Sequence, residues 1–432
     1  MHRHRLVSTA LAVTALSLGI AACGDEDDES SSSSGGGEET LDLTIGSLLP
    51  LTGDLQDFGG SGEKASNVAV DQINAAIEEA GVEHTVTLQV EDDQTTEEGG
   101  ISGAQALVQN DASCISGSYA SGVTIPTAES VTIDEEILQI SPAATSDEIT
   151  GLEDDGFLNR TAPPDSFQGP TLADFMEEEL GGAEGKVVNI GARNDPYGIG
   201  LAETFSAAWE SKNGEIGSET IYDPEAATYD SEAGEIVDGD PDAFVIIDFP
   251  ETYAKMGPAL AGTGDFDPKK AFVTDGLISG DLAKSSGEDA VIGLRGTAPG
   301  SPDEGEAAAA FDEVYSDAEP ADQDRNTFDS QTFDAVMLCY LAAVGAGSTE
   351  GADMAEVVRE ISAAPGDQYT FEELPEMIEA LQNGDDVDYE GASGSIEMDD
   401  TGDATAGVYD TYEFGPDGAP EVVGEVPVAQ PE

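Results

Sequence analysis

The side chains that most often carry out catalysis are scarce in this sequence. Its three histidines are His2, His4 and His84, and its three cysteines form neither a CxxC pair nor a cluster with histidine. Because His2 and His4 lie in a segment that we expect to be removed, a His-based catalytic triad and a zinc site are not expected. The acidic run 399–403 (DDTGD) lacks the twelve-residue spacing and terminal glutamate of a calcium loop. With no nucleophile–base pair and no phosphate-binding loop, the sequence predicts a protein without enzymatic activity, metal or cofactor.

Polar residues that could bind a solute instead follow predicted strands. Ser121, Thr145 and Asp275 each come soon after a short apolar run of the kind that forms a buried strand. In open parallel sheets, ligands bind beyond the carboxyl ends of the strands, where loops from different crossovers converge. We therefore expect these side chains at a ligand-binding edge.

The chain alternates predicted strands and helices in two series, the second of which begins after Arg160. Apolar strands joined by helices are typical of parallel sheets covered on both faces. The predicted fold class is therefore α/β, with two doubly wound parallel-sheet lobes joined by a three-crossover hinge near residues 160, 296 and 392. We expect lobe 1 to comprise 41–160 plus 297–392, and lobe 2 to comprise 161–296 plus 393–426. The predicted strands are 43–49, 85–90, 113–116, 137–140, 187–190, 219–221, 244–247, 270–274 and 291–294, with a late β pattern at 395–414, and the main predicted helices are 63–80, 103–109, 125–134, 167–180, 198–212, 332–344 and 373–382.

The charge balance is extreme. The chain has 14 basic and 91 acidic side chains and a formal net charge of −77, and such a surface repels nucleic acid. The acidic residues are spread along the whole chain, which favours a halophilic or halotolerant source where concentrated ions screen their repulsion. An ordinary acidic secreted protein is the alternative. Hydrophobic residues make up 39% of the sequence, so we expect buried cores and a fold that low salt destabilises.

The first residues predict an export signal. A basic segment at 1–5 precedes the apolar stretch 6–20, which is too short to span a bilayer, and small residues lead to Cys23. This pattern resembles the lipobox of lipoproteins, so we expect 1–22 to be a signal peptide and Cys23 to carry a lipid. A secretory signal with an incidental cysteine is the alternative. Residues 23–40 predict a disordered acidic Ser/Gly tether, and the expected location is the outer face of the cell membrane, or the periplasm.

The other two cysteines lie in apolar surroundings. Cys114 falls in a strand-like run and Cys339 in an apolar helix. Cysteines in such runs are most often buried and behave as small hydrophobic side chains. We therefore expect two free thiols rather than a bridge.

A set of short motifs resembles a known family in both order and spacing. Single strings such as PLTG are weak signals, but the ordered set is specific and covers the chain from about Leu43 to Phe414. It is similar to the leucine/isoleucine/valine-binding family of type I periplasmic binding proteins, which serve ABC importers. The motifs are PLTG at 50–53, FG at 58–59, DD at 92–93, GSYASGVT at 117–124, SPAAT at 141–145, RTAPPDSFQG at 160–169, YGIGLA at 197–202 and YEGASG at 389–394.

The resemblance, carried over position by position, implies how an amino acid would be held. Ser121 and Thr145 would bind the α-carboxylate, and Ala143 and Ala144 would offer backbone groups to the amino-acid head. Neutral donors suit a carboxylate that loses its water. Asp275 stands where the branched-chain binders carry a glutamate that pairs with the ligand ammonium, since a desolvated cation needs a partner charge.

Three aromatic residues are implied as walls of the same site. Tyr197 matches the tyrosine that reaches the ligand from the second lobe, while Phe58 and Phe249 fall where branched-chain binders often have tyrosines. The two missing hydroxyls predict a more apolar wall.

The implied function is that of an extracytoplasmic substrate-binding lipoprotein of an ABC importer. It would capture a branched-chain or other apolar amino acid by hinge closure, as a monomer that delivers its ligand to permease subunits and is held at the membrane by the lipid on Cys23. The alternatives are a binding protein for amides, urea or another small polar solute, and a sensory ligand-binding protein.

Overall fold

The computed structural model describes residues 40–302, 305–321 and 323–430. The predicted signal peptide, Cys23 and nearly all of the predicted tether lie outside these residues. The strands are β1 (Leu41–Leu49), β2 (His84–Asp92), β3 (Ala112–Gly117), β4 (Leu138–Ser141), β5 (Leu158–Arg160), β6 (Val187–Arg193), β7 (Glu215–Tyr222), β8 (Ala243–Ile247), β9 (Ala271–Val273), β10 (Arg295–Pro299), β11 (Asp367–Tyr369), β12 (Val387–Gly391), β13 (Gly394–Ser395), β14 (Ala406–Phe414) and β15 (Pro420–Ala429). The α-helices are α1 (Gln56–Ala80), α2 (Glu97–Gln109), α3 (Ser121–Thr127), α4 (Asp165–Leu180), α5 (Pro196–Ser211), α6 (Asp230–Val237), α7 (Pro250–Thr263), α8 (Leu282–Ser286), α9 (Glu288–Val291), α10 (Glu306–Asp317), α11 (Asp329–Ala346), α12 (Gly351–Ile361) and α13 (Leu374–Asn383).

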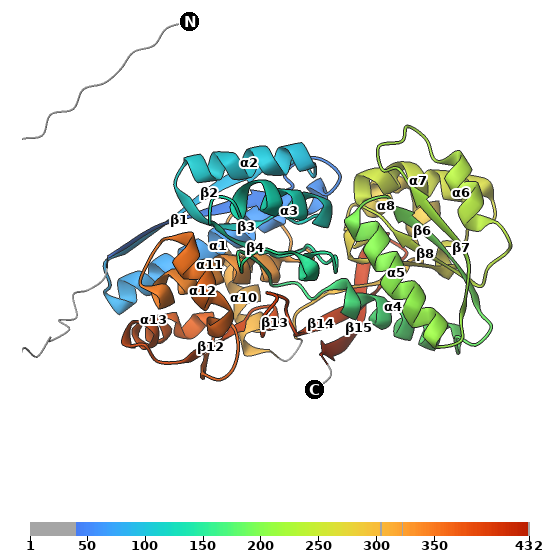
Figure 1. Cartoon of the computed structure of the whole chain (residues 1–432). Coiled ribbons are helices and arrows are strands. Elements are labelled where there is room, and N and C mark those ends of the chain that lie inside the picture. Colours follow the sequence, from blue (N-terminus) through green and yellow to red (C-terminus); the bar gives the residue numbers. More distant parts are fainter. Residues whose placement is uncertain (1–39, 303–304, 322, 431–432) are drawn as a thin grey trace, which may run out of the picture. The chain divides into compact units, whose positions relative to one another are not determined.

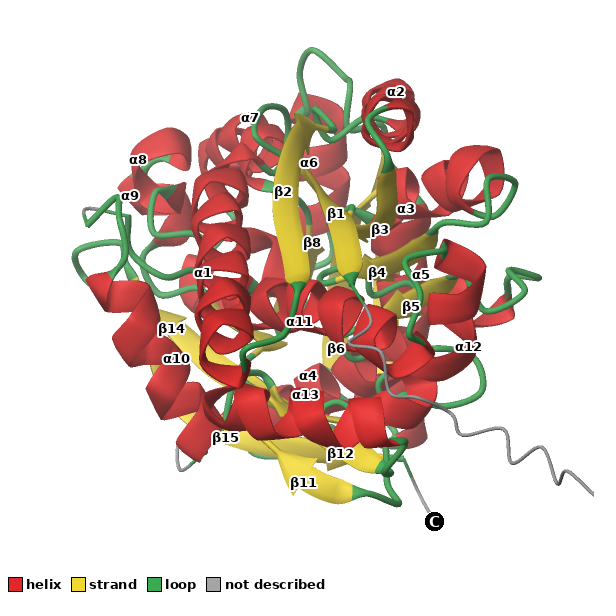
Figure 2. Cartoon of the chain, turned by 90° about the vertical axis from the view of Figure 1, so that its left-hand side faces the viewer, coloured by secondary structure: helices red, strands yellow, loops and turns green. Residues whose placement is uncertain are grey.

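The first sheet is parallel throughout, with the strand order β2-β1-β3-β4-β5. Successive side chains of a strand point to opposite faces, and β3 shows this directly. Cys114 packs in the core formed with α1 and α11, whereas Ile115 packs in the core that includes Ala104 and Leu107 of α2. Helices therefore cover both faces of this sheet (Figures 1 and 2).

The second sheet has seven strands in the order β15-β14-β10-β9-β8-β6-β7. Strands β6 to β10 pair in parallel, and β14 and β15 add an antiparallel edge. On β8, Val245 and Ile247 pack in the core that includes α4 and α5, while Phe244 and Ile246 pack in the core that includes α6 and α7. The α/β class with two parallel-sheet lobes is therefore confirmed, and Figure 1 shows the two groups of elements. The residue limits proposed for each lobe stay a prediction.

Cys114 and Cys339 form a disulfide, so the prediction of two free thiols was wrong. Their Cα atoms lie 5.8 Å apart, within the range that a bridge requires. The bond joins β3 to α11, and both cysteines are fully buried. The sequence pattern located each cysteine on the right kind of element. It contained no sign that α11 packs on β3, because the two lie 225 residues apart.

The element predictions failed mainly between β9 and α13. The predicted strand at 291–294 was wrong, because Val291 ends the short helix α9 and β10 starts only at Arg295. Short apolar runs fit a buried helix end as well as a buried strand. Helices α8, α10 and α12 and strands β5, β11, β12 and β15 were not predicted. The predicted helix 125–134 is helical, but it begins at Ser121 and continues from Thr127 as a π-helix, Ala128–Thr132.

Within the described part of the chain, no single helix has the length and apolar character needed to cross a membrane. Helices α11 and α12 meet those criteria only as a pair, which is bent by 106°.

Candidate functional site

A small cavity lies where loops that follow strands of both sheets meet. Its walls lie close together and leave about 10 Å³, which is room for about one water molecule, so a larger solute can enter only when the walls move apart. The helices and loops around the first sheet contribute Leu55, Phe58, Tyr119, Ala120, Ser121, Ala143 and Phe328. Those around the second sheet contribute Tyr197, Phe249, Asp275 and Gly276.

The structure brings six of the eight predicted ligand-binding residues to this cavity. Phe58, Ser121, Ala143, Tyr197, Phe249 and Asp275 line it. Ala144 and Thr145 do not, although they are fully buried in the turn that continues from Ala143. The Thr145 hydroxyl lies beside the buried carboxylate of Asp165.

Asp275 is the carboxylate of the cavity. It follows β9, is 3% exposed, and accepts a hydrogen bond of 3.0 Å from the Tyr197 hydroxyl. The next residue must be small, since a Cβ on Gly276 would lie 2.6 Å from the Asp248 carbonyl oxygen and 2.8 Å from the Phe249 ring. Burial raises the pKa of Asp275 to about 6, partly offset by hydrogen bonds from Gln168 and Tyr197.

Asp165, at the start of α4, is a second buried carboxylate, which sequence reasoning missed as a site residue. It is fully buried, and its carboxylate lies beside the Thr145 hydroxyl. Burial raises its pKa well above the usual range, the Thr145 hydroxyl offsets this in part, and the charges of Asp275 and Asp147 add to it. The sequence did contain a clue to Asp165. It comes shortly after β5, and residues beyond the carboxyl end of a parallel strand often bind ligands.

The turn that carries Ala143 and Thr145 is fixed from behind by Arg160. This fully buried arginine donates to the carbonyl oxygens of Ala144 and Ser146, at 3.2 and 2.9 Å, and pairs with Asp403 at 2.7 Å. Ser121 is tied to the same turn, because its hydroxyl accepts a 3.2 Å bond from the Ser146 amide. The hydroxyl and turn backbone are therefore preformed.

Aromatic rings close the remaining walls. Tyr197 and Phe249 stack with ring centres 5.1 Å apart, so the second lobe presents a rigid double ring. On the opposite side, Phe328 adopts the left-handed backbone region (φ 74°), which costs strain in a bulky residue and persists only when the surroundings enforce it. Sequence patterns could not have shown this, because the position precedes α11 without any turn signature.

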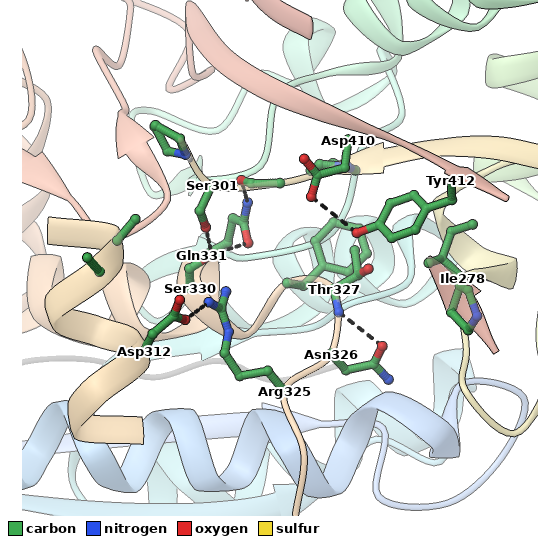
Figure 3. A pocket seen from close by; sticks show the side chains of 17 residues that line it. Ile278, Ser301, Asp312, Arg325, Asn326, Thr327, Ser330, Gln331, Asp410 and Tyr412 are labelled. Atoms are coloured by element: carbon green, nitrogen blue, oxygen red, sulfur yellow. Dashed lines mark hydrogen bonds and ion pairs between the residues drawn. The ribbon is translucent and has the colours of Figure 1, made fainter. Parts of the chain in front are cut away.

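A larger and more open cavity adjoins the first, and Phe328 lines both. Its polar groups mostly bind one another, as Figure 3 shows: Arg325 pairs with Asp312, Ser301 with Ser330, and Tyr412 donates to Asp410. The smaller cavity is the stronger candidate, because it places the buried carboxylate of Asp275 and the hydroxyl of Ser121 in one apolar enclosure.

The acidic run 399–403 forms a turn. The Asp399 carboxylate accepts hydrogen bonds from the amides of Thr401 and Asp403, and Asp403 pairs with Arg160. Among the described residues, no group of three or more His, Cys, Asp or Glu side chains is arranged to hold a metal ion.

Comparison with known proteins agrees with the two-lobed fold, which is that of solute-binding proteins. The family model described as periplasmic binding protein matches residues 42–409. The chain therefore belongs to the periplasmic binding protein family, whose members bind solutes outside the cytoplasm and are not enzymes.

Individual relatives extend this result. The Leu/Ile/Val-binding protein homolog 1 of Brucella abortus (strain 2308) is 27% identical over 326 residues, which cover 74% of this chain and 82% of that protein. Two solved structures share the fold. One is the branched-chain amino acid transporter substrate-binding protein LivJ of Streptococcus pneumoniae with isoleucine (TM-score 0.71, 21% identity, covering 90% of this chain and 99% of that one). The other is a solute-binding protein of R. palustris with benzoate (TM-score 0.68, 18% identity, 90% and 98%).

Proposed function

We propose that this protein captures an amino acid with an apolar side chain between its two lobes and delivers it to an ABC importer. One observation carries the proposal. The cavity has neutral donors on one side, Ser121 and the turn at Ala143, and a buried carboxylate, Asp275, on the other. A zwitterion carries the two charges that this arrangement complements.

The two buried carboxylates favour a ligand with an ammonium group. The charge of Asp275 helps to raise the pKa of Asp165, and burial raises the pKa of both groups. An ammonium near both would supply donors and positive charge, and would lower both pKa values. The carboxylate of the same ligand would bind the Ser121 hydroxyl and would compete with Asp165 for the Thr145 hydroxyl.

The walls favour an apolar side chain. The cavity has apolar walls formed by Leu55, Phe58, Phe249 and Phe328. Burial of an apolar ligand side chain against them would contribute about 25 cal/mol of binding free energy per Å². The curated relatives named as Leu/Ile/Val-binding proteins support the same choice.

Capture would proceed by hinge closure, with the first lobe holding the carboxylate and the second adding Tyr197 and Asp275. The lipid on Cys23 would hold the monomer at the outer face of the membrane, within reach of the permease.

An aromatic carboxylate such as benzoate is the second candidate, because the walls are aromatic and one structural neighbour binds it. It is disfavoured by charge, since its single carboxylate would share a buried site with Asp165 and Asp275 and bring no cation. A small amide or urea would leave both aspartates without a counter-charge.

A thermal-shift screen in molar salt tests these alternatives. The panel comprises the twenty amino acids, benzoate, urea and acetamide. Leucine, isoleucine or valine should raise the unfolding midpoint, because a ligand at 100 times its Kd adds about 2.7 kcal/mol of stability. Stabilisation by benzoate or amides alone would refute the proposal, and so would binding of a deaminated leucine as tight as that of leucine.

A further inference from the structure

One short segment of the first lobe carries much of the direct contact with the second. It runs from Asp54 to Asp57, between β1 and the first turn of α1. Asp54 accepts a 3.2 Å bond from the Thr252 hydroxyl, Gln56 bonds to Glu251, and Asp57 accepts a 2.6 Å bond from the Ser279 hydroxyl. These partners all belong to the second lobe, so the segment 54–57 is a contact strip that exists only when the lobes meet.

Arg193, at the end of β6, supplies the positive charge at this strip. It is 4% exposed in a chain that has only 14 basic residues against 91 acidic ones. Its guanidinium bonds to Asp195 and lies 3.7 Å from Asp248, both in its own lobe, and it reaches Asp54 of the other lobe at 3.2 Å. The buried guanidinium of Arg193 therefore lies close to three carboxylates, and one of them, Asp54, belongs to the opposite lobe.

The same arginine contacts the wall of the cavity. Its guanidinium carbon lies 3.6 Å from the centre of the Phe249 ring, which is cation–π distance. Phe249 stacks on Tyr197, whose hydroxyl donates to Asp275. An unbroken series of contacts therefore runs from the cavity carboxylate to the interlobe ion pair.

We infer that Arg193 is a positioning residue that links occupation of the cavity to lobe closure, by holding Phe249 against the cavity and binding Asp54 of the opposite lobe. The inference rests on the proposed capture by closure. Asp195 and Asp248 hold the guanidinium in place whether the cleft is open or closed, so only the bond to Asp54 forms on closure. Because the guanidinium is preorganised, little side-chain freedom is lost when that bond forms.

Two substitutions in the contact strip distinguish the effect of the Arg193–Asp54 ion pair from that of an ordinary polar contact. Asp54→Asn removes the charge that meets Arg193. Asp57→Asn removes an equal charge three residues away, where the partner is a neutral serine hydroxyl, and it keeps a hydrogen-bond acceptor. The measurements are leucine affinity and dissociation rate at 50 mM and 2 M salt, and the radius of gyration of the solute-free protein by small-angle scattering.

Asp54→Asn should weaken leucine binding by about 3- to 10-fold at low salt, mainly through faster dissociation, because Asp54 is one-third exposed and its pair is partly screened. The loss should shrink in 2 M salt. Asp57→Asn should change affinity by less than about 2-fold. In the absence of solute, Asp54→Asn should give the larger radius of gyration of the two variants.

Equal affinities and equal radii for the two variants would overturn the role of Arg193 and leave the proposed function standing. If the unmodified protein binds no amino acid, the proposed function fails, and the solute-free scattering comparison then decides whether Arg193 still holds the lobes together.

Discussion

Replacing Asp275 with asparagine should separate binding from stability, because the two properties respond in opposite directions. The carboxylate is 3% exposed, and its partners, Tyr197 and Gln168, are neutral. If it pairs with a ligand ammonium, Asp275→Asn removes the counter-charge that lines the cavity and leaves only Asp165, which burial favours in its neutral form. Removing one member of such a pair costs about 2 to 5 kcal/mol, or roughly 30- to 4,000-fold in Kd.

The free energy of unfolding of the solute-free protein should instead increase in Asp275→Asn. Burial raises the pKa of Asp275 from 3.8 to about 6, so the folded state holds this proton more tightly than the unfolded state does. The resulting stability is present below about pH 4 and is lost as pH rises through about 6. At pH 8 the ionised group therefore costs about 3 kcal/mol, which the neutral asparagine avoids.

Calorimetric titration with leucine in molar salt at pH 8 measures the first effect, and denaturant unfolding without ligand measures the second. Asp275→Glu is the matched control, since it keeps the charge and should retain most of the affinity. Unchanged leucine affinity in Asp275→Asn, with normal binding by the parent protein, would remove Asp275 from the site. A less stable solute-free variant would show that the carboxylate is not strained by burial.

Three further outcomes follow from buried groups and surface charge. Replacing Cys114 and Cys339 with alanine should lower the free energy of unfolding by about 2 to 5 kcal/mol, because the bond closes a loop of 225 residues; an unfolding midpoint unaffected by reductant would contradict this. Solute-free stability should fall from pH 5 to pH 8, since burial raises the pKa of Asp248 and of Asp329 to about 7; a rise over that range would refute the assignment. Unfolding midpoints should increase from dilute buffer to molar salt, because the net charge is −77, and equal midpoints would argue against a salt-adapted surface.

The sequence predicted most of the sheet-forming runs because local patterns determine them. Strands such as β1 and β8 are short apolar runs, and their burial on both faces is what a doubly wound sheet requires. Ser121 and Asp275 were found for the same reason, since each follows a predicted strand and the carboxyl ends of parallel strands meet.

Contacts between distant segments were not accessible in the same way. Nothing local to Cys339 shows that α11 packs on β3, and nothing local to Phe328 shows its left-handed backbone. Asp165 was passed over because an aspartate that opens a helix is common. Only its full burial marks it as unusual.

The disulfide also determines what a single backbone cut would do. The chain builds part of the first lobe, leaves to form the second and then returns, and Cys114 and Cys339 lie on either side of that excursion. Protease cleavage between β7 and α6 would therefore yield two fragments that migrate together on a gel without reductant and apart with it.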